Sequence, residues 1–126
     1  MNEKILIIDD SRSMVKSLEL LLKQYKFNVE SAHDGISGLE KVKSFRPDLI
    51  FLDIEMPQMD GFDTLVEIKK LMNRDYVSAI IMLSSHHSQS DVIKAMKNGA
   101  QDYIVKPFDE NILRKKINKY LNIQSP

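Results

Sequence analysis

The sequence predicts an α/β fold, a doubly wound parallel sheet of five strands with helices on both faces. Two observations lead to this prediction. Short apolar runs alternate five times along the chain with longer segments whose apolar residues recur at helical spacing. The connections between them are short, which is typical of β-then-α units joined into one parallel sheet. Runs that are apolar throughout suit strands that are buried on both faces.

The first unit begins with a strand over Lys4 to Asp9, because Ile5 to Ile8 is continuously apolar and mostly β-branched. Asp10 or Ser11 then caps a helix. The apolar residues of this helix are Met14, Leu18, Leu21, Leu22 and Tyr25. The second unit begins with a weaker strand over Asn28 to Ala32.

A turn at Asp34-Gly35 starts the second helix, and Pro47 ends that segment because the residue before a proline disfavours the α conformation. The third strand ends at Asp53, after an apolar run that begins at Leu49. Pro57 and then Asp60-Gly61 signal a turn and the start of the third helix. The apolar residues of these two helices are Ile36, Leu39 and Val42 in one, and Phe62, Leu65, Val66, Ile68 and Leu71 in the other.

The fourth strand is expected over Ser78 to Leu83, and a polar loop over His86 to Ser90 leads into the fourth helix. Asn98-Gly99 is a typical C-terminal cap for that helix. Tyr103 to Val105 forms the fifth strand, and Asp109 starts the last helix. The apolar residues of these helices are Val92, Ile93 and Met96 in one, and Ile112, Leu113, Ile117 and Leu121 in the other.

Length and composition limit the class of protein. The chain of 126 residues is expected to form one domain over 1–126, with an ordered core of about residues 3–121. The 18 basic and 18 acidic residues balance, so no nucleic-acid footprint is expected. Without cysteine there is no disulfide framework and no thiolate metal site. The longest N-terminal apolar run, Ile5 to Ile8, is too short for a signal peptide or a membrane span, so we expect a cytoplasmic protein.

The carboxyl ends of the strands carry the reactive residues. In an open parallel sheet these ends lie along one edge, where ligands bind. Four of the five strands end there in polar residues, which are Asp9-Asp10, Asp53, Ser84 and Lys106. These residues are far apart in the sequence, yet the predicted topology brings them into one pocket.

This set of residues suits one kind of chemistry. Three neighbouring carboxylates repel one another and need positive charge to ionise. Lys106 supplies one charge, and a divalent cation supplies the rest. Oxygen ligands without histidine or cysteine suit Mg²⁺, or Mn²⁺. A carboxylate nucleophile beside a metal, a lysine and a hydroxyl predicts an aspartyl-phosphate site.

Four motifs together resemble the receiver domain of two-component response regulators, over essentially the whole chain, and are similar to the single-domain chemotaxis type. These motifs are Ile-Ile-Asp9-Asp10-Ser, Asp53-Ile-Glu-Met-Pro-Gln-Met-Asp-Gly61, Met-Leu-Ser84-Ser85 and Tyr103-Ile-Val-Lys106-Pro107-Phe. The resemblance implies the flavodoxin-like strand order 2-1-3-4-5. It also implies a signalling phosphoacceptor that catalyses only its own phosphorylation and dephosphorylation.

The resemblance implies roles for the acidic residues. Asp53 is the expected phosphoacceptor, and the phosphodonor is a phosphohistidine on a sensor histidine kinase or a histidine phosphotransfer protein. Asp10 is the expected direct Mg²⁺ ligand, and Asp9 is expected to hold a metal-bound water. Asp53 and the backbone carbonyl of Glu55 complete the expected protein ligands.

The resemblance also implies a switch. Lys106 is expected to pair with Asp53 and later with the phosphoryl oxygens, and its bond to Pro107 is expected to be cis. Ser84, where most members have threonine, binds the phosphoryl group and draws its loop inward, while Tyr103 rotates inward. A local charge change is thereby read at a surface. That surface, formed by the last two helices and the fifth strand, is expected to bind a downstream protein or an output domain.

Two further hypotheses concern residues near the pocket. Glu55 and His86 lie two residues beyond Asp53 and Ser84, at positions that tune the phosphoryl lifetime in the family. We therefore hypothesise that they set this lifetime here. Met14 and Val15, on the first helix near the mouth of the site, are hypothesised to help dock the phosphodonor.

Three other functions account for fewer of these residues. An aspartyl phosphatase commonly carries a second acid two residues after its nucleophile, and Glu55 stands there, but Met56-Pro57 follows instead of threonine or valine. A flavin binder on the same fold needs a hydroxyl- and glycine-rich first loop, whereas Asp9-Asp10 would repel a phosphate. A phosphate-independent protein-binding module would not need the complete set of acids, hydroxyl and lysine.

Overall fold

The structure is a computed structural model that describes residues 3–85 and 88–121. Its single sheet is parallel throughout, and its strand order β2-β1-β3-β4-β5 is the one expected. The strands are β1 (Lys4–Ile8), β2 (Asn28–Ala32), β3 (Leu49–Asp53), β4 (Ala79–Ser84) and β5 (Asp102–Val105). The helices are α1 (Arg12–Gln24), α2 (Gly35–Phe45), α3 (Gly61–Lys70), α4 (Gln89–Lys97) and α5 (Glu110–Leu121). Among the described residues, no helix has the length and apolar character needed to cross a membrane.

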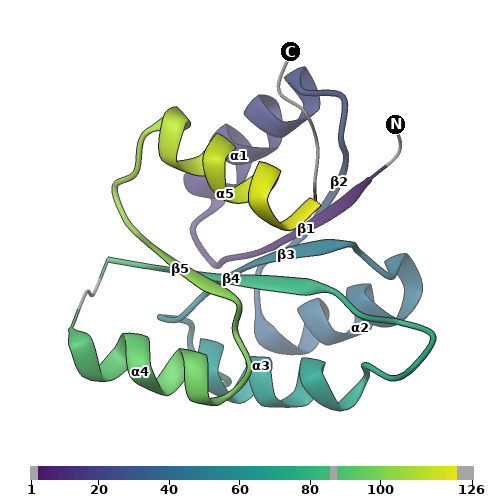
Figure 1. Cartoon of the computed structure of the whole chain (residues 1–126), viewed down its shortest axis with the longest axis vertical. Coiled ribbons are helices and arrows are strands. Elements are labelled where there is room, and N and C mark those ends of the chain that lie inside the picture. The colour runs from purple at the N-terminus through teal and green to yellow at the C-terminus, as the bar shows by residue number, and fades with distance from the viewer. Residues whose placement is uncertain (1–2, 86–87, 122–126) are drawn as a thin grey trace.

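Helices cover both faces of the sheet. α1 and α5 lie on one face, and α2, α3 and α4 lie on the other (Figure 1). Successive strand residues alternate between the two faces. In β1, Ile5 and Ile7 pack in the core beneath α1 and α5, whereas Leu6 and Ile8 pack against the opposite helices. All the strand residues from Leu49 to Asp53 are buried, as expected for a central strand between two helical layers.

The register of the sheet brings the reactive strand ends together. Asp53 is the partner of Leu83 in the β3–β4 pair, and Ser84 is the partner of Val105 in the β4–β5 pair. The amide of Lys106 continues this pairing by donating to the carbonyl of Ser84 at 2.7 Å. The residues at the carboxyl ends of β1, β3, β4 and β5 therefore meet at one edge of the sheet.

Side-chain caps start the helices. Of the two caps considered for α1, Ser11 is the one observed, because its Oγ accepts from the amide of Met14 at 3.3 Å. Asp10 is exposed and does not make this cap. The cap expected at Asp109 is confirmed, since its carboxylate accepts from the amide of Ile112 at 2.8 Å. Asp34, Asp60 and Ser88 cap the other helices in the same way.

Element ends differ slightly from the prediction. β4 begins one residue later than expected and includes Ser84, so the predicted switch hydroxyl belongs to the strand end itself. α2 ends at Phe45 with Arg46 in the left-handed region at φ 49°. Arg46 precedes Pro47, and the ring of Pro47 disfavours the α conformation at the residue before it.

Gly61 allows α3 to start directly behind Asp53. Its amide donates to the carbonyl of Ile54 at 2.9 Å. A Cβ at this position would lie 2.3 Å from the carbonyl oxygen of Asp53 and 2.6 Å from Cα of Ile54. Both are backbone atoms, so a side chain here would displace the strand end that carries the acid.

We expect Gly61→Ala to lower the free energy of unfolding by about 3 kcal/mol, because overpacking against backbone cannot relax cheaply. Gly38→Ala is the matched control, since its Cβ would meet Cδ1 of the Ile8 side chain at 2.6 Å. That side chain can move, so a loss of only about 1 kcal/mol is expected. Urea denaturation measures both variants, and equal losses would contradict this account.

Asp102 connects the start of β5 to α5. Its carboxylate accepts from Lys116 Nζ at 2.9 Å on each oxygen and from the Tyr120 hydroxyl at 2.7 Å. Burial would raise the pKa of Asp102, but the hydrogen bonds from Lys116, Tyr120 and the Tyr103 amide outweigh burial and leave the pKa lowered. The ionised form of Asp102 therefore stabilises the fold.

Asp102→Asn should lower the free energy of unfolding by about 2 kcal/mol at neutral pH. A depressed carboxyl pKa contributes stability that is complete above the unfolded pKa, near 4, and is lost as the pH falls through the folded pKa. The difference between wild type and variant should therefore shrink below about pH 4. Urea denaturation across this pH range tests it, and a difference that persists in acid would argue against it.

Candidate functional site

Three aspartates meet at the carboxyl edge of the sheet. Carboxylate oxygens of Asp9, Asp10 and Asp53 all lie within 4.8 Å of one another. Asp9 and Asp53 are buried, at 0% and 2% exposed, whereas Asp10 is exposed. The predicted convergence of these acids is confirmed. The site therefore has two buried carboxylates and one at the solvent boundary.

Lys106 lies between the two buried acids. Its Nζ is 2.8 Å from Oδ2 of Asp9 and 3.3 Å from Oδ1 of Asp53. Burial would lower the pKa of Lys106, but the hydrogen bond to Asp9 and the charges of Asp53 and Asp9 raise it, so the amine stays protonated. The expected pairing with Asp53 is present, and Asp9 is the closer partner. The Lys106–Pro107 bond is cis, which is the expected isomer.

One lysine does not compensate three carboxylates. Burial, followed by the charge of Asp9, raises the pKa of Asp53 to about 7, against the opposing charge of Lys106. The site is thus short of positive charge. Its donors are carboxylate oxygens, which suit a hard divalent cation such as Mg²⁺.

Ser84 makes a contact that the sequence does not predict. Its Oγ donates to Oε2 of Glu55 at 2.6 Å. Ser85 also donates to this side chain, through Oγ at 2.9 Å and through its amide at 3.3 Å to Oε1. The carboxylate of Glu55 therefore bridges the β3–α3 loop to the end of β4.

Tyr103 is half-buried and packs against the core on the α2–α4 side of the sheet. Burial raises the pKa of its hydroxyl, which lies within hydrogen-bond reach of the Ser84 side chain. The expected coupling partners, Tyr103 and Ser84, are thus in contact. His86, the other residue expected to tune the phosphoryl lifetime, lies outside the described residues.

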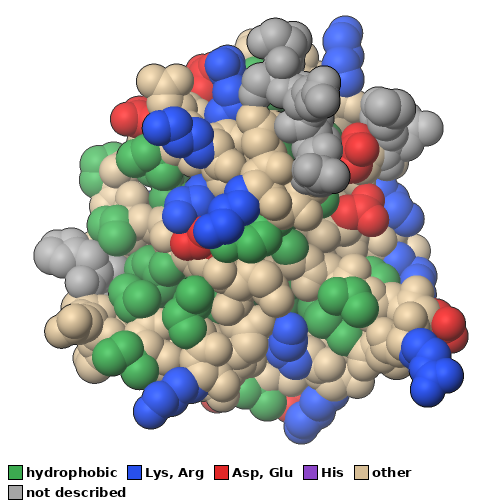
Figure 2. Space-filling view, in the orientation of Figure 1, with side chains coloured by type: hydrophobic (Ala, Val, Ile, Leu, Met, Phe, Trp, Pro, Cys, Tyr) green, Lys and Arg blue, Asp and Glu red, His purple; other side chains and the backbone are tan. Residues whose placement is uncertain are grey.

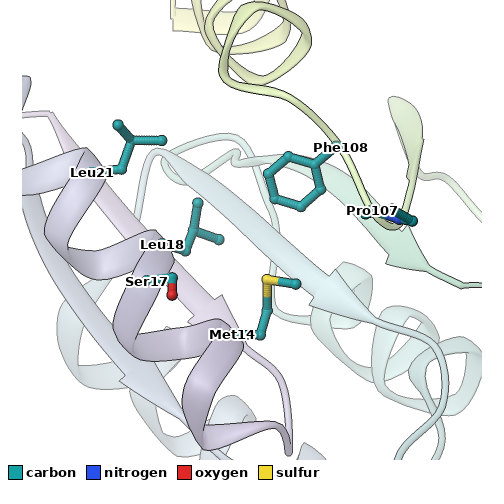
Figure 3. A pocket seen from close by; sticks show the side chains of 6 residues that line it. All are labelled: Met14, Ser17, Leu18, Leu21, Pro107 and Phe108. Carbon is teal, nitrogen blue, oxygen red and sulfur yellow. The ribbon is translucent and has the colours of Figure 1, made fainter.

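A small apolar cavity of about 220 Å³ lies between α1 and the loop after β5. Met14 points into it toward Phe108 (Figure 3). Val15, the next residue along the helix, is 2% exposed and packs in the core. The hypothesis that Val15 helps to dock a phosphodonor is therefore wrong, whereas Met14 remains at an accessible surface.

Residues 5–118 match the model of the response regulator receiver domain family. The chain is 43% identical over 125 residues to the chemotaxis protein CheY of Bacillus subtilis, which covers 97% of this chain and 100% of that relative.

Longer relatives and solved structures agree with this match. The transcriptional regulatory protein PhoP of Bacillus subtilis is 33% identical over 121 residues, and the chain spans about half of its length, 49%. A solved CheX–CheY–BeF₃–Mg²⁺ complex from Borrelia burgdorferi contains a chain that is 30% identical with a TM-score of 0.87. That match covers 97% of this chain and 90% of the solved one.

We expect Asp53→Asn to raise the free energy of unfolding by about 2 kcal/mol in EDTA at pH 7.5, because it removes a buried, poorly compensated charge. A raised carboxyl pKa destabilises the fold above the unfolded pKa, near 4, so the gain should shrink as the pH falls. Mg²⁺ should stabilise the wild type more than the variant. Urea denaturation measures these effects, and a variant less stable than wild type in EDTA would refute the charge argument.

Proposed function

Since this chain belongs to the response regulator receiver family, and is thus a phosphoacceptor of two-component signalling, we propose that Asp53 is the residue that accepts the phosphoryl group. The observation that carries the proposal is the lysine shared between Asp53 and Asp9, with Asp10 at the solvent side. Of the three aspartates, Asp53 is the one that belongs to a strand, at the end of β3, and it contacts Lys106 Nζ at 3.3 Å.

The proposed step is a transfer between a phosphohistidine and Asp53. A carboxylate oxygen of Asp53 attacks phosphorus, and a P–O bond forms as the P–N bond of the donor breaks. The electron pair of that P–N bond stays on the departing imidazole nitrogen. Such transfers need mainly alignment and neutralisation of charge. Lys106 supplies a fixed positive charge next to the attacking oxygen and remains to bind the phosphoryl oxygens.

The acidic residues fit a role in holding Mg²⁺, or Mn²⁺. Asp10 and Asp53 would be direct ligands with the backbone carbonyl of Glu55, and Asp9 would hold a metal-bound water. When bound, the cation supplies charge neutralisation for the attacking and transferring oxygens. Asp9 is already paired to Lys106 at 2.8 Å, which suits an indirect rather than a direct ligand.

The proposed partners are a sensor histidine kinase or a histidine phosphotransfer protein and a downstream protein, in the cytoplasm. A surface made by α4, β5 and α5 suits the downstream partner. It carries exposed apolar residues, and Figure 2 shows such side chains gathered over α4 and β5. They are Ile93 and Met96 of α4, Val105 of β5 and Ile112 of α5. Ser84 and Tyr103, in contact beside this surface, would pass the change at Asp53 to it.

Incubation with acetyl phosphate and Mg²⁺, followed by intact mass measurement, tests the phosphoacceptor. One phosphate should appear on the wild type and on Asp75→Asn, an exposed aspartate far along the chain, and none on Asp53→Asn. EDTA should abolish the addition to wild type, because the charge deficit then remains. Phosphate on Asp53→Asn, or steady hydrolysis of a small phosphomonoester by the wild type, would contradict the proposal.

The phosphoryl lifetime tests the proposed role of Glu55 and His86. Exchanging both for alanine should change the first-order rate of phosphate loss severalfold, because side chains at these positions are expected to guide or exclude the attacking water. The measurement is the decay of the phosphorylated mass after the acetyl phosphate is removed. An unchanged rate would end this part of the proposal.

A further inference from the structure

The carboxylate of Glu55 collects three hydrogen bonds from two neighbouring residues. Ser84 Oγ donates to Oε2 at 2.6 Å, and the Oγ and amide of Ser85 donate to Oε1 at 2.9 and 3.3 Å. Glu55 follows β3, whereas both serines stand at the end of β4. The contact therefore links two segments that both border Asp53.

We infer that Glu55 is a positioning residue that holds the Ser84 hydroxyl in the resting state and thereby opposes the phosphoryl-bound conformation. The inference rests on the proposed function, in which that hydroxyl binds the phosphoryl group on Asp53. It adds a competitor for Ser84 that exists before any phosphoryl group arrives.

The Ser84 hydroxyl carries a single proton. While this proton is donated to Glu55, it cannot be donated to a phosphoryl oxygen. The Glu55 contact is short and charge-assisted, which makes it about twice as strong as a neutral hydrogen bond. The phosphoryl group must therefore replace a strong bond rather than bind an idle hydroxyl.

Ser85 makes the restraint specific. Its two donors bind the second carboxylate oxygen, so the two oxygens of Glu55 are oriented by separate partners. A carboxylate held on both oxygens cannot easily follow Ser84 toward Asp53. Ser85 thus keeps Glu55, and through it Ser84, in the resting arrangement.

The negative charge of Glu55 is a separate effect. It lies close enough to Asp53 to add to the repulsion felt by that carboxylate. Removing the charge could favour a phosphoryl group without any role for hydrogen bonding. A test must therefore break the contact while keeping the charge.

Glu55→Asp does this, because its side chain is one methylene shorter and cannot span the 2.6 Å contact from the same backbone position. The charge remains, and so does the backbone carbonyl proposed as a metal ligand. Ser85→Ala is the second variant, which removes one donor that orients Glu55 and changes no charge. Glu55→Gln removes the charge but keeps an oxygen that can accept from Ser84.

The probe is beryllofluoride with Mg²⁺, titrated calorimetrically. We expect Glu55→Asp to bind it about tenfold more tightly than wild type, and Ser85→Ala about threefold more tightly, in line with the loss of charged and weaker hydrogen bonds. Glu55→Asp should have no effect in a Ser84→Ala background, because the restrained hydroxyl is then missing.

Three results would overturn the inference. If Glu55→Asp and Ser85→Ala both bind beryllofluoride within twofold of the wild-type affinity, the contact does not restrain Ser84. If only Glu55→Gln binds beryllofluoride more tightly, the effect comes from the charge of Glu55. The same gain for Glu55→Asp with and without Ser84 would also overturn it. A wild type that binds no beryllofluoride would instead be a failure of the proposed function.

Discussion

The site depends on one amine between two buried acids. Lys106 contacts Asp9 and Asp53, and both carboxylates are almost inaccessible to water. Buried charges are costly unless they are paired, and here one positive charge serves two acids with a third nearby. The sheet holds this arrangement in place, since Asp9 follows β1, Asp53 ends β3 and Lys106 follows β5, and these strands belong to one sheet. The remaining deficit of positive charge makes the edge receptive to a cation.

The same edge connects the charge change to the surface. Ser84 belongs to β4, contacts Tyr103 of β5, and donates to Glu55 beyond β3. Under the proposed function, a phosphoryl group on Asp53 would compete with Glu55 for the Ser84 hydroxyl, so that binding by one would exclude binding by the other. Such a competition would give two arrangements of packed residues, which a partner on the proposed α4, β5 and α5 surface would distinguish.

The sequence was sufficient for the topology and for the meeting of the acids and the lysine. Apolar runs fix the strands, and parallel strands bring their carboxyl ends to one edge whatever the loops do. It was not sufficient for contacts that depend on a rotamer. Shifts of about an ångström decide such contacts. They determine whether Ser11 or Asp10 caps α1 and whether Lys106 lies nearer Asp9 or Asp53. They also determine which partner the Ser84 hydroxyl takes. Val15 and Met14 are neighbours in sequence, and only the helix phase places one in the core and the other at the surface.

The most direct measurement follows the carboxyl carbon of Asp53 by NMR as the pH is changed, in EDTA and again with saturating Mg²⁺. We expect Asp53 to titrate near pH 7 without a cation, because burial and the charge of Asp9 raise its pKa more than Lys106 lowers it. Saturating Mg²⁺ should move this titration well below pH 7. Titration near its ordinary pKa, about 4, that is unaffected by Mg²⁺ would contradict the claim that the site lacks positive charge.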